Sequence, residues 1–253
     1  MKQKRLIVYL IVGFATLLNA VFTFAALAPA LALSKVQYGG ASVLPYTRWK
    51  PKNQGGKAYL LLLREASGTD KGTYDALGGR RDPKEEPKDT ASRELSEEAM
   101  GLLGNPGTLL TYIDSLGKNT RNVVVNDNKH TVIYITKFSP QSLGNLVSNF
   151  YSKRQQLLTN PQANRKFLEK DSIAWVSWQN LEQAIGQAPR NANGQLITPI
   201  KVWANVVDAA GKKNAAQIDL RPVFVSSLQS FFKNAQPPIL RQGHNPKVKF
   251  YTY

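Results

Sequence analysis

Acidic side chains gather in one short stretch of an otherwise basic chain. The chain has 17 Asp and Glu against 33 Lys and Arg. Carboxylates crowded together repel one another unless a positive charge lies between them. Several oxygen ligands in one place favour a hard divalent cation such as Mg²⁺, with Mn²⁺ as a substitute. The acidic residues of this stretch include Asp82, Glu85, Glu86, Glu94, Glu97 and Glu98.

The second half of the stretch is predicted to form a helix that begins near Pro87. Proline suits the first turn of a helix, and Gly104 with Pro106 would end it. Between them, apolar residues recur at helical spacing at Ala91, Leu95, Ala99 and Leu102. On such a helix Glu94, Glu97 and Glu98 stand at i, i+3 and i+4 and share one face. This face is the candidate metal site.

Two further features fit that chemistry. The pair Gly78-Gly79 lets the backbone approach a metal ion or a phosphate closely. Arg93 lies one turn before Glu97 and can hold its carboxylate in place. An ordinary solvated acidic helix is the alternative, but it does not explain the glycine pair or the arginine.

This spacing resembles the Nudix box of the Nudix hydrolases, Gly-x5-Glu-x7-Arg-Glu-U-x-Glu-Glu-x-Gly-U, where U is a bulky aliphatic residue. The sequence departs from the box at its end, where Met100-Gly101 stands in the reverse order. The matching positions are Gly79, Glu85, Arg93, Glu94, Leu95, Glu97 and Glu98.

The resemblance implies a role for each residue of the box. Glu97 and Glu98 would be the principal Mg²⁺ ligands, together with the carbonyl of Gly78. Glu94 would be a further ligand or the base that activates water. Glu85 and Arg93 would orient the cluster as part of the catalytic set.

The resemblance also implies a fold and a reaction. The fold is an α/β/α sandwich with a mixed sheet over residues 38–235. The reaction is Mg²⁺-dependent hydrolysis of a nucleoside diphosphate linked to another group, by attack of water on the pyrophosphate. The substrate would also contact Gly79 and Glu169. Glu169 or Asp171 would be an additional acid outside the box, and the end of a solvated helix is the alternative interpretation of both. ADP-ribose, dinucleoside polyphosphates, nucleotide sugars, oxidised nucleotides and capped RNA all suit this description.

A second function remains open, a non-catalytic module that binds nucleotide or RNA on the same fold. The reversed Met100-Gly101 suggests it, and the net charge of +16 favours anionic partners. A third reading is a basic protein associated with the cell envelope or with RNA. No long basic block interleaved with aromatics appears, so a dedicated nucleic-acid module is not indicated.

The first 32 residues have the pattern of a secretory signal peptide. Lys2, Lys4 and Arg5 precede an uncharged run over residues 6–33, and cleavage is expected after Ala32. The protein would then be exported, to the periplasm or the medium. The run is also long enough for an uncleaved membrane anchor. The chain has no cysteine, which excludes disulfides, thiolate zinc sites and a cysteine nucleophile.

The remaining elements follow from shorter patterns. Strands are expected at residues 41–46, 58–64, 109–113, 122–125, 131–138 and 173–178, with a hairpin turn near Asp127-Asn128. Helices are expected at 143–170, as an insertion of about 142–170 divided by Pro161, and at 179–185 and 220–232. The polar residues up to Asp219 receive no element. Residues 236–253 form a tail in which 247–253 is an edge strand or frayed.

A few other side chains could take part in binding. Tyr74, Trp175 and Trp178 could stack on a base, but a core position is the preferred reading. His130 and His244 are too isolated for a zinc site or a catalytic dyad and are read as surface or structural residues.

Overall fold

The computed structural model of the protein describes residues 38–49, 57–116, 123–126 and 130–234. The leader at 1–32, the turn at Asp127-Asn128, His244 and the 236–253 tail lie outside these residues. None of the helices in the described ranges is long and apolar enough to cross a membrane.

One mixed sheet forms the centre of the described chain. Its order is β3-β9-β8-β7-β2-β1-β6-β5, and β4 pairs with β1. The pairs β1–β6 and β3–β9 are parallel and the other pairs are antiparallel. The strands are β1 (Gly40–Trp49), β2 (Lys57–Glu65), β3 (Tyr74–Asp75), β4 (Leu77–Arg80), β5 (Val123–Asn126), β6 (Thr131–Lys137), β7 (Lys170–Ser177), β8 (Ile200–Val207) and β9 (Lys213–Leu220).

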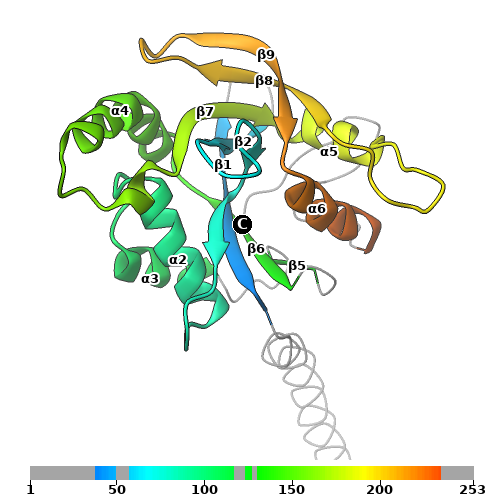
Figure 1. The fold of residues 1–253 in the computed structure, drawn as a ribbon, viewed down its shortest axis with the longest axis horizontal. Helices are drawn as coiled ribbons and strands as arrows, with labels where there is room; N and C mark the ends of the chain where they lie inside the picture. The colour runs from blue at the N-terminus through cyan, green and yellow to red at the C-terminus, as the bar shows by residue number, and fades with distance from the viewer. Residues whose placement is uncertain (1–37, 50–56, 117–122, 127–129, 235–253) are drawn as a thin grey trace, which may run out of the picture. The chain divides into compact units, whose positions relative to one another are not determined.

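Helices cover both faces of this sheet, as Figure 1 shows. One layer holds α2 (Pro87–Glu98), α3 (Pro106–Leu116) and α4 (Pro140–Thr159), with the short η3 (Arg165–Leu168) after them. The other layer holds α5 (Trp178–Gly186) and α6 (Pro222–Asn234). The expected α/β/α arrangement with a mixed sheet is therefore present.

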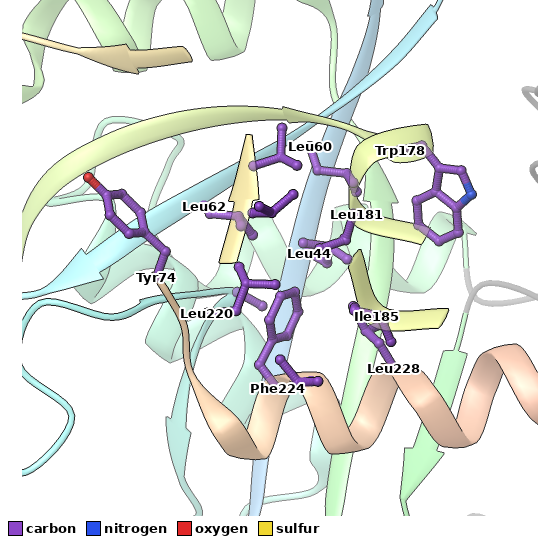
Figure 2. Close-up of a cluster of buried hydrophobic side chains, with 14 of the residues drawn as sticks. Leu44, Leu60, Leu62, Tyr74, Trp178, Leu181, Ile185, Leu220, Phe224 and Leu228 are labelled. Carbon is purple, nitrogen blue, oxygen red and sulfur yellow. The ribbon is translucent and has the colours of Figure 1, made fainter. Parts of the chain in front are cut away.

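Each layer encloses its own apolar core. Because side chains alternate across a strand, Leu61 and Leu63 of β2 face the α2 side, while Leu60 and Leu62 face the α5–α6 side. In Figure 2, Phe224 and Leu228 of α6 lie against this second core. Burial on both faces explains why β2 reads as a nearly continuous run of leucines.

Most of the predicted elements are confirmed. The strands expected at 41–46, 58–64, 122–125, 131–138 and 173–178 correspond to β1, β2, β5, β6 and β7. The helices expected at 179–185 and 220–232 correspond to α5 and α6. The helical stretch divides near Pro161, since α4 ends at Thr159, but Lys170 already belongs to strand β7.

Two predictions were wrong. Residues 109–113, read as a strand, lie in α3, which starts at Pro106 after Asn105 accepts a hydrogen bond from the Thr108 amide at 2.9 Å. Leu109 and Ile113 are one helical turn apart and both are buried, which is the helical spacing.

The second error was the polar stretch before Asp219, which contains the β8–β9 hairpin. Asp208 makes its turn by accepting hydrogen bonds from the amides of Ala210 and Lys212. Strand β8 alternates buried Ile200 and Val202 with exposed Lys201 and Trp203, a pattern that average polarity does not reveal.

Candidate active site

The glycine pair Gly78-Gly79 lets strand β4 lie close to both strand β1 and helix α2, the helix that carries the Nudix-box glutamates. A Cβ atom at Gly78 would lie 2.0 Å from Cβ of Ser42, and one at Gly79 would lie 2.5 Å from Oε1 of Glu94. Neither space accepts a side chain, so close backbone approach is what these glycines provide. The carboxylate of Glu94 consequently lies directly against the Gly79 backbone.

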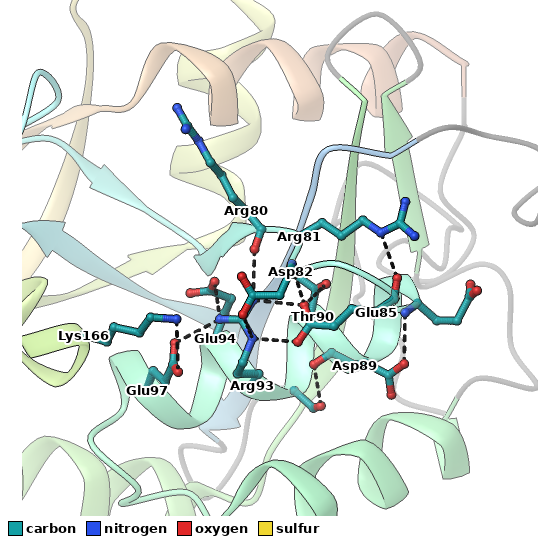
Figure 3. Close-up of polar contacts among 12 residues, drawn as sticks. Arg80, Arg81, Asp82, Glu85, Asp89, Thr90, Arg93, Glu94, Glu97 and Lys166 are labelled. Carbon is teal, nitrogen blue, oxygen red and sulfur yellow. Dashed lines mark hydrogen bonds and ion pairs between the residues drawn. The ribbon is translucent and has the colours of Figure 1, made fainter. Parts of the chain in front are cut away.

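Arg93 is the centre of a cluster of carboxylates on the outer side of α2, shown in Figure 3. Its Nε donates to Oε1 of Glu85 at 2.7 Å. Its Nη1 lies 2.7 Å from Oε1 of Glu94 and 3.0 Å from Oε2 of Glu97. Its Nη2 donates to the carbonyl of Arg80 at 2.9 Å. One planar guanidinium therefore orients three carboxylates and the end of β4.

Glu85 stays ionised within this cluster. The hydrogen bond from Arg93 lowers its pKa from 4.5 to about 2, against the opposing effect of burial. Thr90 Oγ1 donates to it at 2.7 Å, and the Asp82 amide donates at 3.0 Å. Glu85 therefore serves as a fixed anchor for Arg93.

Glu94 is in the opposite situation. Its side chain is 9% exposed, and burial raises its pKa. Arg93 lowers this pKa, while the negative charges of Glu97 and Glu169 raise it further. A carboxylate with a raised pKa is a stronger base than a free glutamate.

The side chain of Glu98 points from α2 towards the sheet, where it contacts Gly78 of β4 and Lys170 of β7; this is called the inner side of α2. Its Oε2 accepts a hydrogen bond from the Gly78 amide at 2.9 Å, and its Oε1 lies 3.0 Å from Nζ of Lys170. The side chains of Glu98 and Lys170 are each 1% exposed. Burial raises the pKa of Glu98 well above its usual range.

Lys170 belongs to a second cluster that sequence reasoning did not find. Besides Glu98, its ammonium pairs with Glu65. Arg221 reaches Glu65 at 3.5 Å and Asp75 at 3.1 Å. Burial alone lowers the pKa of Lys170, but the carboxylates of Glu98, Asp75 and Glu65 outweigh burial and raise it. The carboxylates therefore favour the charged form of this buried lysine.

The donor atoms of the outer cluster suit a hard divalent ion. Across the described ranges no three His, Cys, Asp or Glu side chains are arranged to hold a metal ion together. Glu94 and Glu97 nevertheless converge on the same nitrogen of Arg93. Each keeps a second oxygen without a hydrogen bond to a described residue, and the nearest cation to that of Glu97 is Lys166 at 3.7 Å. Oxygen ligands with spare lone pairs fit Mg²⁺.

The two acidic residues expected outside the Nudix box, Glu169 and Asp171, have different surroundings. Glu169 lies close enough to Glu97 for their charges to interact, whereas Asp171 pairs with Nε of Arg64 at 2.7 Å. The three aromatic candidates, Tyr74, Trp175 and Trp178, are buried core residues. His130 is exposed, and its carbonyl accepts a hydrogen bond from the Gly39 amide at 2.6 Å, so its part is structural.

A cavity of about 280 Å³ adjoins the outer cluster through the glycine pair. Arg80 and Arg221 contribute charge to it, while Ile133 and Phe224 contribute apolar surface. The volume is near the lower end of the range for small-molecule sites. The other lining residues are Gly39, Gly40, Ala41, Ser42, Asp75, Gly78, Gly79, Thr131, Val223 and Ser227.

A larger cavity of about 320 Å³ lies elsewhere on the sheet, between β2, β7, β8 and the start of α5. Trp203, 58% exposed, and Tyr59 line it. It contains no residue of the acidic stretch. Size alone therefore does not identify the active site. The smaller cavity is favoured because Gly79, one of its lining residues, lies against the carboxylate of Glu94.

The reversed Met100-Gly101 pair gives the box helix an unusual end. The amides of Met100 and Gly101 donate to the carbonyls of Glu97 and Ser96 at 3.0 and 2.8 Å, as in a Schellman motif. Met100 takes the left-handed position with φ 54°, where glycine is usual. Its side chain is 3% exposed, so burial offsets the strain.

The sequence was compared with models of known protein families and with curated proteins. The family model described as NUDIX domain matches residues 51–196, more than half of the chain. A search of curated proteins gave no match.

Three solved structures show distant similarity. A Nudix hydrolase from M. smegmatis, RenU, is 15% identical with a TM-score of 0.32, covering 78% of this chain and 84% of that one. An Ap4A hydrolase from C. elegans is 17% identical and a mutT/nudix family protein from Listeria innocua is 14% identical. Both have a TM-score of 0.29 and cover 58% of this chain and 82% of theirs.

The assignment rests on the family model, and the box residues it includes are the ones gathered on α2 and β4. The chain belongs to the Nudix hydrolase family.

Proposed function

We propose that this protein hydrolyses the pyrophosphate bond of a nucleoside diphosphate linked to another group, with Mg²⁺ or Mn²⁺ held at the outer carboxylates of α2. Pyrophosphate hydrolysis of such derivatives is the general reaction of the Nudix family. The observation that carries the proposal is Gly79, which lines the cavity and also touches the carboxylate of Glu94. A substrate in this cavity would place its diphosphate beside the site's base.

Glu94 and Glu97 are the residues that would hold the ion, with the carbonyl of Gly78 and Glu169 beside them. When bound, Mg²⁺ supplies positive charge that stabilises the phosphoryl oxygens. Arg93 holds the carboxylates of Glu94 and Glu97 in place by ion pairs, and an ion pair with Glu85 fixes Arg93 itself. The chain therefore presents preorganised oxygen ligands, which lowers the cost of assembling the site.

In the reaction, the oxygen of water forms a bond to one phosphorus, and the bond from that phosphorus to the bridging oxygen breaks. The bridging oxygen leaves on the second phosphate, so two phosphate-bearing products result. Glu94 takes one proton from the attacking water through the oxygen that does not hold the ion, and burial makes this carboxylate a stronger base than a free glutamate. The second hydrogen of the water stays on the new phosphate group as a hydroxyl, and the leaving phosphate departs as an anion.

The cavity would hold the part of the substrate beyond the reacting phosphorus. Arg80 carries an exposed guanidinium, which in Figure 3 points away from the carboxylates. It is a suitable partner for a non-reacting phosphate. Phe224 and Ile133 offer apolar surface for a sugar or base.

The test is a panel of nucleoside diphosphate derivatives with product identification. We expect turnover with Mg²⁺ or Mn²⁺, and a loss of about a hundredfold or more in Glu94→Gln and Glu97→Gln. Asp208→Asn, in the β8–β9 turn, is the matched control and should keep full activity. Binding of nucleotide without turnover by the wild type would instead favour the non-catalytic module.

We also propose that residues 1–32 direct export, or anchor the protein in a membrane. The support is the basic start and the uncharged run that follows it. The N-terminal sequence of the protein recovered from its native host is the test. Cleavage after Ala32 is expected for a signal peptide, and an intact start in a protein that washes free of membranes contradicts both readings.

A further inference from the structure

Glu97 and Glu98 are adjacent in the sequence but have different surroundings. Glu97 is 15% exposed and faces the outer cluster, while Glu98 is 1% exposed. Both oxygens of Glu98 already have partners, the Gly78 amide at 2.9 Å and the Lys170 ammonium at 3.0 Å. Each oxygen of Glu98 therefore already accepts one hydrogen bond, and the Lys170 ammonium would repel a divalent ion that bound there.

The Lys170 ammonium is firmly held in its position. It is the first residue of β7 and stands opposite Glu65 of β2, with which it also pairs. Removing a buried ammonium from its carboxylates leaves an uncompensated charge, which costs several kcal/mol. Only 1% of the lysine side chain is exposed, so water cannot replace the lost partner.

Building on the proposed function, we propose that Lys170 is a built-in cation for Glu98 and takes this glutamate out of the metal-binding set. The divalent ion then binds on the outer side of α2 alone, at Glu94 and Glu97. This differs from the role that the Nudix resemblance implies for Glu98, which is that of a principal ligand. Lys170 provides at Glu98 the charge balance that an ion would otherwise provide.

In this arrangement Glu98 has a structural role and does not bind the metal ion. Its second oxygen holds the Gly78 amide, so the Lys170–Glu98 pair fixes the start of the glycine pair that lines the cavity. The chain of charges continues from Glu65 to Arg221, which lines the same cavity. Lys170 is therefore a positioning residue, since it acts on the site through Glu98 and Gly78.

The experiment counts bound Mn²⁺ by electron paramagnetic resonance in the full chain and in single variants. Glu97→Gln should weaken Mn²⁺ binding by about tenfold or more, as expected for a lost ligand or a close supporting group. Glu98→Gln should weaken it by less than about threefold, because the amide still accepts from Gly78 and Lys170 keeps Glu65. Equal losses in both variants, with circular dichroism showing both folded, would overturn the proposal.

A second variant covers the case in which Glu98→Gln does not fold. Lys170→Met combined with Glu98→Leu replaces the ion pair by apolar side chains, an exchange that is often neutral for stability. This double variant should keep the Mn²⁺ count and affinity of the wild type within about threefold, and loss of Mn²⁺ from the folded double variant would contradict the proposal. A wild type that binds no Mn²⁺ would refute the proposed function itself, and this proposal with it.

Discussion

Two cations lie on opposite sides of helix α2, and each is surrounded by carboxylates. Arg93, 15% exposed, joins Glu85, Glu94 and Glu97, whereas Lys170, 1% exposed, joins Glu98 and Glu65. Water can still solvate the outer cluster but not the inner one. The two clusters therefore differ in what they can bind. The carboxylates of the exposed cluster can take up another cation, whereas those of the buried cluster keep Lys170.

Lys170→Met is expected to have the largest effect on stability. It leaves Glu98 buried without a cation, and breaking such a pair from one side costs about 3–5 kcal/mol. The matched control is Lys166→Met on the outer side, whose ammonium is 46% exposed and 3.7 Å from Glu97. Its loss should cost no more than about 1 kcal/mol. Urea unfolding of both variants makes the comparison, and equal losses would show that the two sides do not differ.

Arg93→Met should have the next largest effect. The outer glutamates lose hydrogen bonds to a charged donor, worth about 2–3 kcal/mol in total after water replaces part of them. Arg81→Met is the control, since the exposed Arg81 only donates to the Glu85 carbonyl and stacks on Tyr38 at 4.8 Å. Thermal unfolding should separate the two variants clearly. An Arg93 variant as stable as the control would mean that the outer carboxylates need no cation.

Met100→Gly tests the helix end that sets the two glutamates on their separate sides. Relief of the left-handed backbone gains about 1–2 kcal/mol, while loss of a buried methionine costs about 2–5 kcal/mol. We expect a net loss of about 1–3 kcal/mol in denaturant unfolding. A gain in stability would show that strain exceeds packing, and that the usual glycine of the box would serve better here.

Acid should weaken the outer cluster in a defined range. The pKa of Glu85 falls from 4.5 to about 2 on folding, so its stabilising effect is complete above pH 4.5 and is lost as pH falls towards about 2. Glu85→Gln should therefore be less stable than the wild type at pH 6, and this gap should close in acid. Unfolding by urea between these values measures the gap, and a constant gap would rule out the titration of Glu85.

The outer cluster could be predicted from the sequence because its members lie within one short segment. Helical spacing alone places Glu94 beside Glu97, and Arg93 one turn before it. The inner cluster could not be predicted. Its residues come from β2, β3, β7, the end of α2 and the residue after β9, and only the tertiary fold brings them together.

Lys170 shows the physical reason most clearly. Sequence reasoning selected its neighbours Glu169 and Asp171, because acidic residues were sought. The strand pairing shifts between Arg64 and Glu65, so Lys170 rather than Asp171 stands opposite Glu65. A bulge of this kind changes which side chain faces a site, and it cannot be predicted from residue types or their spacing.

The fold shows a similar division. Strands with strong apolar patterns were found, β2 at nearly its observed bounds and β7 without its first three residues. The β8–β9 hairpin was missed because only one face of it is buried and most of its outward residues are polar. Alternation, rather than mean polarity, carries the signal for such a hairpin.

The central claim is that water attacks a phosphorus held beside Glu94 and Glu97. The most direct measurement runs the reaction in water enriched in the heavy oxygen isotope and weighs both products by mass spectrometry. We predict one heavy oxygen in a phosphate-bearing product of the wild type, and almost none formed by Glu97→Gln. A folded wild type that forms no labelled phosphate product from any diphosphate derivative, with Mg²⁺ and Mn²⁺ supplied, would contradict the account.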